Sequence, residues 1–110
     1  MQTVVELPHF TKKVREVLSD EEKSLAINYL AAHPKSGALI QGTGGIRKLR
    51  WATGNKGKSG GIRVIYYYHN ESIPLFLLTA FGKNEKANLS RAERNDLATL
   101  TRLLQANYGE

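Results

Sequence analysis

The segment Ile62-Arg63-Val64-Ile65-Tyr66-Tyr67-Tyr68-His69 contains the strongest strand signal in the sequence. It is filled with β-branched and aromatic residues, and the polar stretch at 70–72 that follows it predicts a turn. Because side chains alternate along a strand, the segment has two faces. One face is expected to carry Arg63, Ile65 and Tyr67, and the other Ile62, Val64, Tyr66 and Tyr68.

Two more strands are expected, one before and one after this segment. Residues 46–53 alternate in character, so that Lys48 and Arg50 share one face while Arg47 points to the opposite face. Residues 75–81 form an apolar run of strand length. The three segments together predict a sheet in which basic side chains gather on one face.

The connection between the first two of these strands is rich in glycine. Seven of the ten glycines lie at 42–61, and residues 54–61 are predicted to form a basic hairpin loop that carries Lys56 and Lys58. Residues 52–59 also fit a relaxed phosphate-binding loop. That chemistry needs a helix after the loop, and a strand follows here, so nucleotide binding is not favoured.

Three helices are expected from apolar spacing and from helix-start signals. One covers about residues 10–18, and two others begin at Ser19 and Ser90, each with a glutamate three residues later that completes a capping box. A short strand at 3–7 precedes them. This order predicts a single domain over residues 1–110 of the α+β class, with a curved antiparallel sheet, the helices packed on one face and the other face open.

Positive charge is concentrated in the middle of the chain. The 110 residues contain 16 Lys and Arg against 10 Asp and Glu, a net charge of +6. Residues 23–70 contain eight of the cations and no acidic residue, so this stretch has a net charge of +8. The rest of the chain contains the other eight cations and all ten acidic residues, so its net charge is −2. A field of one sign attracts a polyanion. With Lys48, Arg50 and Arg63 expected on the open face, the pattern favours nucleic acid over a membrane surface.

Other classes of chemistry are disfavoured by what the sequence lacks. It has no cysteine, which excludes disulfides, thiolate metal sites and cysteine nucleophiles. No apolar run reaches the ~18 residues of a membrane span, so a cytoplasmic protein without a membrane partner is expected. No paired carboxylates have metal-ligand spacing, and the three histidines are scattered, so neither a metal cofactor nor a histidine-pair ribonuclease is indicated.

The remaining cationic and aromatic side chains suit RNA. RNA carries its own nucleophile, the 2′-OH, so a protein can cleave it by neutralising charge at phosphorus and protonating the departing 5′-oxygen. Tyr67 shares a face with Arg63 and is a candidate to stack on a base, whereas Trp51 is expected in the core. The same surface could bind RNA without any chemistry, and this alternative stays open.

Three segments are informative as a set. They are Ile40-Gln41-Gly42-Thr43-Gly44-Gly45-Ile46-Arg47-Lys48-Leu49-Arg50, Gly60-Gly61-Ile62-Arg63-Val64-Ile65-Tyr66-Tyr67 and Leu77-Leu78-Thr79-Ala80-Phe81-Gly82-Lys83-Asn84-Glu85-Lys86. In this order they resemble the RelE/HigB toxins of bacterial type II toxin–antitoxin pairs, and the first is close to the HigB-type subgroup. The similarity covers nearly the whole chain.

The resemblance implies a compact fold like that of microbial ribonucleases. It also implies cleavage of messenger RNA in the ribosomal A site, without a metal ion. Arg63 would bind the scissile phosphate, Lys48 and Arg50 would act as a base and a charge-stabilising group, and Lys83 would lie in the cationic segment that closes the site. RNA contacts are expected from Arg47, Lys56, Lys58, Tyr67 and Phe81.

The resemblance further implies that a cognate antitoxin silences the protein. Acidic or amphipathic segments of such a partner would suit the basic region. The expected partners are therefore an antitoxin, the ribosome and messenger RNA. A ParE-type toxin, which shares the fold but inhibits DNA gyrase, is the alternative, and the cations on the sheet face favour the nuclease.

Overall fold

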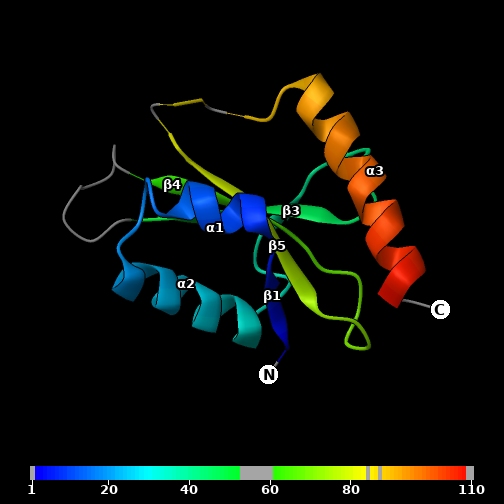
Figure 1. Ribbon diagram of the computed structural model, residues 1–110, viewed down its shortest axis with the longest axis horizontal. Coiled ribbons are helices and arrows are strands. Elements are labelled where there is room, and N and C mark those ends of the chain that lie inside the picture. The colour runs from blue at the N-terminus through cyan, green and yellow to red at the C-terminus, as the bar shows by residue number, and fades with distance from the viewer. Residues whose placement is uncertain (1, 53–60, 84, 87, 109–110) are drawn as a thin grey trace.

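The computed structural model describes residues 2–52, 61–83, 85–86 and 88–108. The strands expected from the sequence are confirmed, each to within two residues at either end, and one short strand is additional. Within these ranges the elements follow one another (Figure 1) in the order β1 (Val4–Glu6), α1 (Pro8–Val14), α2 (Asp20–Ala32), β2 (Ala38–Leu39), β3 (Ile46–Trp51), β4 (Ile62–Tyr67), β5 (Leu75–Gly82) and α3 (Arg91–Tyr108).

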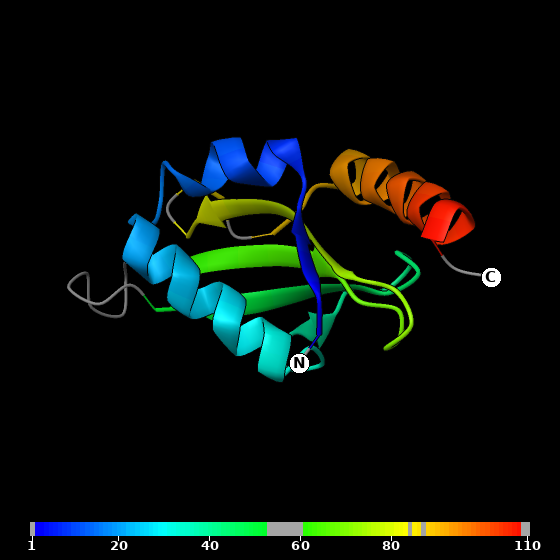
Figure 2. The ribbon, with the colours of Figure 1, turned by 60° about the horizontal axis from the view of Figure 1, so that its bottom comes forward.

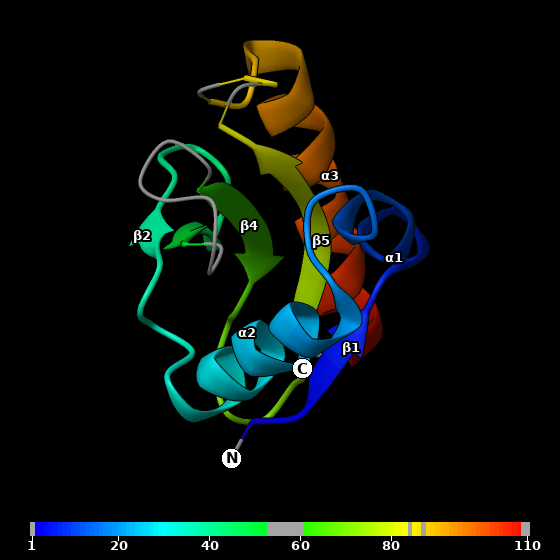
Figure 3. The ribbon, with the colours of Figure 1, turned by 90° about the vertical axis from the view of Figure 1, so that its left-hand side faces the viewer.

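The strands form one sheet in the order β1-β5-β4-β3-β2. The pairs from β2 to β5 are antiparallel, but β1 runs parallel to β5. The expected antiparallel sheet is therefore corrected to a mixed one. The physical reason is that β1 and β5 are not joined by a hairpin, so the chain is free to return beside β1 in the same direction. A register shift between Ile65 and Tyr66 interrupts the β4–β5 ladder, and β5 bends visibly in the curved sheet (Figure 3).

Helices cover both faces of the sheet, which corrects the expectation that they pack on one face and leave the other open. Phe10 of α1 and Leu30 of α2 belong to an apolar cluster on one face, and Leu104 of α3 belongs to a cluster on the other. Figure 1 shows α2 and α3 on opposite sides of the sheet. All residues of β4 are buried, as is typical of strands covered on both faces.

The cover that α3 provides is partial. Its apolar side chains meet Ile46 and Tyr67, which pair with each other at one end of β3 and β4. Arg50 and Arg63 pair near the other end of the same two strands. Figure 2 shows α3 lying over one end of the sheet, away from the last residues of β3 and the first residues of β4. The basic end of the two strands thus lies beyond the apolar contacts of α3.

Both capping boxes form as the sequence predicts. Ser19 Oγ accepts from the Glu22 N–H, and Ser90 Oγ accepts from the Glu93 N–H, while each glutamate accepts from the serine backbone in return. The first helix is shorter than the expected range of residues 10–18, because it begins at Pro8 and ends at Val14. Of the helices described, none combines the length and apolar character of a membrane span.

Candidate active site

Arg50 on β3 and Arg63 on β4 are directly opposed partners on neighbouring strands. Phe81 on β5 is the next partner in the same row, opposite Arg63. Directly opposed side chains on neighbouring antiparallel strands point to the same face, with their Cβ atoms about 5 Å apart. Two cations and an aromatic ring therefore stand in one row, on the face of the sheet that α3 covers only in part.

Lys83 joins the two arginines around a small cavity of about 150 Å³ beside this row. Trp51, Ala52 and Gly61 complete its lining, and we call it the arginine cavity. The backbone N–H of Lys83 donates to the Gly61 carbonyl at 3.1 Å, which ties the end of β5 to the start of β4. This hydrogen bond holds the lysine next to Arg63 although 20 residues separate them in sequence.

The three cations of the arginine cavity differ in exposure. Arg63 is 8% exposed, and within the described residues its guanidinium donates one hydrogen bond, a long one of 3.5 Å to the neighbouring Ile62 carbonyl. Arg50 and Lys83 are exposed. Among the described residues, none of the three forms an ion pair with a carboxylate. A buried charge without a counter-charge is costly, so the cavity is suited to an external anion, and guanidinium matches the geometry of phosphate.

Lys48 is separated from the other predicted catalytic residues. It lies on the same face of β3 as Arg50, but it lines a different cavity of about 310 Å³ together with Ile40, Asn88, Leu89 and Arg94. We call this the Lys48 cavity. The Lys48 ammonium donates to Asn88 Oδ1 at 2.8 Å. The structure thus brings together Arg50, Arg63 and Lys83 and leaves Lys48 in an adjoining space.

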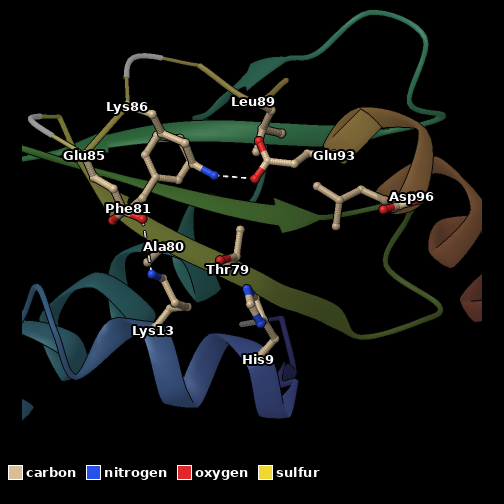
Figure 4. Close-up of a pocket in the computed structure, with 11 residues that line it drawn as sticks. His9, Lys13, Thr79, Ala80, Phe81, Glu85, Lys86, Leu89, Glu93 and Asp96 are labelled. Carbon is tan, nitrogen blue, oxygen red and sulfur yellow. Dashed lines mark hydrogen bonds and ion pairs between the residues drawn. The ribbon is translucent and has the colours of Figure 1, made fainter. Parts of the chain in front are cut away.

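A third cavity, of about 430 Å³, lies against Phe81 between α1, β5 and α3 (Figure 4). The Lys86 ammonium is 4.9 Å from the centroid of the Phe81 ring and forms an ion pair with Glu93. The hydrogen bonds that Glu93 accepts, first from Lys86 and then from the Ser90 backbone, lower its pKa. Three carboxylates and two lysines line this cavity, whereas the described residues that line the other two cavities include cations but no carboxylate.

The opposite wall of the third cavity carries a second ion pair. Lys13 of α1 contacts Glu85 at 3.2 Å and Glu16 at 3.3 Å. Hydrogen bonds to Glu85 and then to Glu16 raise the pKa of Lys13. The Lys13–Glu85 pair connects the segment after β5 with α1 on one side, while the Lys86–Glu93 pair connects it with α3 on the other.

Three of the predicted RNA contacts are basic residues, namely Arg47, Lys56 and Lys58. Arg47 points to the other face, as strand alternation predicts, and donates to the carbonyl oxygens of Lys35 at 3.1 Å and Gly37 at 2.8 Å. Its guanidinium therefore has a role within the fold. Lys56 and Lys58 lie outside the described residues.

The two predicted aromatic contacts are buried. Tyr67 is fully buried beneath α3, its hydroxyl donates to Gln105 Oε1 at 3.3 Å, and burial raises its pKa. Phe81 is 1% exposed, with Lys86 over its ring. A base could reach Tyr67 only if α3 moved, and Phe81 only if Lys86 moved. In this conformation neither ring offers a stacking surface, because Tyr67 is packed in the apolar cluster beneath α3 and Phe81 lies under Lys86.

Sequence reasoning missed three polar residues near the basic face. Lys86 could have been found from the sequence, because it is the last residue of the third segment that resembles RelE/HigB toxins. Asn88 and Arg94 carried none, since their position beside Lys48 depends on where α3 crosses the sheet. Within the described ranges, no three side chains of His, Asp or Glu gather so that they could hold a metal ion.

The match to a known protein family covers almost the entire chain. The family model described as the RelE toxin of the RelE / RelB toxin–antitoxin system matches residues 3–109 of this 110-residue sequence. The matched range includes every described strand and helix and all residues of the arginine cavity. A partner antitoxin is implied by that description. With a mixed sheet and three described helices in agreement, the chain belongs to the RelE family of toxins.

Proposed function

We propose that this toxin cleaves messenger RNA in the ribosomal A site without a metal ion, and so inhibits translation. The observation that carries the proposal is the arginine cavity, in which Arg50, Arg63 and Lys83 face one small space and pair with no described carboxylate. Such a set of cations binds a phosphodiester and stabilises the additional negative charge that phosphorus acquires during cleavage.

The reaction needs few protein groups because RNA supplies the nucleophile. The 2′-oxygen attacks the adjacent phosphorus and gives its proton to solvent water, the P–O5′ bond breaks, and a 2′,3′-cyclic phosphate remains while the 5′-oxygen takes up a proton. Arg50 and Arg63 bind the non-bridging oxygens. Arginine does not release its proton in proteins, so Lys83 is the cavity side chain that protonates the 5′-oxygen.

Lys48 is assigned to binding in this proposal rather than to proton abstraction. Its ammonium acts as a donor to Asn88 Oδ1, and it lines the adjoining cavity rather than the arginine cavity. The resemblance implies that Lys48 and Arg50 act as a base and a charge-stabilising group. In this proposal Arg50 stabilises charge, and Lys48 does not act as the base.

The size of the arginine cavity supports dependence on the ribosome. At about 150 Å³ it is smaller than the usual range of ligand pockets, so it suits one phosphate group rather than a whole nucleotide. The alignment of the 2′-oxygen, phosphorus and 5′-oxygen must then be imposed from outside, and such alignment contributes strongly to the rate. A messenger held by the ribosome meets this need, which implies a cytoplasmic location.

The test is controlled expression of the toxin in bacteria with mapping of messenger RNA ends. The wild type is expected to arrest growth and to produce new 5′ ends in register with codons. Arg63→Ala should reduce cleavage about a hundredfold or more, since it removes charge-assisted contacts to the reacting phosphate. Arg102→Ala, an equal charge change on the exposed side of α3, is the matched control and should cleave like the wild type.

Co-purification with the antitoxin shows that each variant is folded. Intact RNA together with altered DNA supercoiling would support gyrase inhibition instead. RNA binding with unchanged RNA ends would reduce the protein to a binding module. Either result would overturn the proposed cleavage.

A further inference from the structure

The Lys48 cavity is a second cationic space on the same face of the sheet as the arginine cavity. Lys48 and Arg50 are alternate residues of β3, and alternate residues of a strand are about 7 Å apart along its axis. Lys48 lines one cavity and Arg50 the other, so the spacing of these two residues along β3 is close to the length of one nucleotide in an extended RNA strand.

The side chains of the Lys48 cavity leave donors available for a ligand. The Lys48 ammonium has three protons, and only one hydrogen bond, to Asn88 Oδ1 at 2.8 Å, is formed with the described residues. The Arg94 guanidinium forms no ion pair with any carboxylate of the described ranges. The hydrogen bond to Asn88 holds the ammonium toward α3, on which Arg94 stands.

The charge of the Lys48 cavity distinguishes it from the largest of the three cavities described above. Among the described residues that line it, Lys48 and Arg94 carry charge and none is a carboxylate. The cavity against Phe81 is lined instead by Glu85, Glu93 and Asp96 as well as by cations. Glu93 precedes Arg94 in sequence, but its carboxylate is paired with Lys86. An anionic strand that leaves the arginine cavity thus meets a favourable charge at the Lys48 cavity and an unfavourable one beside Phe81.

We propose that the Lys48 cavity binds the RNA phosphate next to the scissile one, with Lys48 and Arg94 as the contacts and Asn88 as the residue that positions Lys48. The inference rests on the proposed function, because the arginine cavity defines which phosphate is scissile. It adds Arg94 as a binding residue, and it gives Lys48 a role that does not require it to lose a proton.

The test is binding of a fluorescent RNA oligonucleotide that carries 2′-O-methyl groups, which prevent cleavage, so that the readout does not depend on the reaction. Arg94→Ala is expected to weaken binding about tenfold at low salt and to reduce the slope of log affinity against log salt by about one. Arg102→Ala has the same charge change on the same helix and should alter the slope much less. Asn88→Ala, which keeps both cations, should weaken binding by a smaller factor than Arg94→Ala.

A neutral methylphosphonate at single positions of the oligonucleotide locates the contact. At one phosphate next to the cleavage position it should weaken wild-type binding more than it weakens binding by Arg94→Ala, because that variant has already lost one of the two contacts to the phosphate. Equal RNA affinities and equal salt slopes for Arg94→Ala and Arg102→Ala would overturn the subsite. The same conclusion would hold if Arg94→Ala weakened the binding of an acidic antitoxin peptide but not of RNA. If Arg63→Ala impairs binding while Arg94→Ala does not, the subsite alone is wrong. If neither Arg63→Ala nor Arg94→Ala weakens RNA binding, the proposed function fails as well.

Discussion

Arg50 and Arg63 are direct cross-strand partners, so the central pair of strands holds two guanidinium groups opposite each other. The adjacent pair, Leu49 and Val64, is apolar and buried. Like charges in directly opposed positions destabilise a sheet, whereas apolar pairs stabilise it. The repulsive pair lies at the arginine cavity, where a bound phosphate would cancel the repulsion.

The first prediction is that Arg50→Gln makes the toxin more stable and less active. Removing one charge of the pair should raise the free energy of unfolding by about 0.2–0.5 kcal/mol, because the repulsion from Arg63 disappears. Cleavage should fall at least tenfold, since one phosphate contact is lost. Urea unfolding and mapping of RNA ends measure the two effects. A variant that loses stability and activity together would show that Arg50 has a structural role instead.

The second prediction concerns Arg47, where the opposite outcome is expected. Arg47→Ala should lower the free energy of unfolding by about 1–2 kcal/mol, because its charged hydrogen bonds to the Lys35 and Gly37 carbonyls are lost. Cleavage by the folded fraction should stay within about threefold of the wild type, since Arg47 points away from the arginine cavity. A large loss of activity at full stability would restore Arg47 as an RNA contact.

The third prediction compares two neighbouring tyrosines. The Tyr66 hydroxyl donates to the Pro34 carbonyl and accepts from the Gly37 N–H, both at 2.8 Å. Tyr66→Phe should therefore cost about 2–3 kcal/mol of unfolding free energy, because buried backbone groups lose their partner. Tyr67→Phe is the matched control and should cost under about 1 kcal/mol, since the hydrogen bond that its hydroxyl forms within the described residues is a long one of 3.3 Å to the exposed Gln105. Equal costs in urea unfolding would contradict this account.

The fourth prediction is a change in the pH dependence of stability at Glu93. The pKa of Glu93 is lowered from 4.5 in the fold, chiefly by Lys86, so its carboxylate stabilises the folded state above that value. This contribution is lost as pH falls through the lowered folded pKa. Glu93→Gln should therefore lose less stability than the wild type between about pH 5 and pH 3. The difference should stay under about 1 kcal/mol, because the side chain is 41% exposed.

Thermal unfolding across that pH range measures the effect of Glu93. Glu71→Gln is the control, since Glu71 is exposed in the turn before β5 and forms no ion pair with a described residue. If the wild type and Glu93→Gln lose stability in parallel on acidification, the ion pair with Lys86 contributes nothing measurable to the fold.

Local patterns predicted much of what surrounds the site. Alternation in β3 and β4 correctly separated Arg47 from Arg50 and gave Arg63 and Tyr67 a common face, because the period of a strand is fixed by its backbone geometry. The serines at 19 and 90 gave the starts of α2 and α3, because their capping boxes are completed within one turn. These features depend on residues close together in the chain.

The sequence by itself therefore determined the strands and helix starts, the α+β class and the positive region of the chain. Only the tertiary structure decided that β1 joins β5 in parallel, that α3 covers the face expected to be open, and that this cover buries Tyr67. It also decided that Lys48 lines a cavity with Asn88 and Arg94 rather than sharing the cavity of Arg63. Periodicity states which side of an element is apolar, but which partner covers that side depends on contacts between distant segments, and these are settled only when the whole core packs.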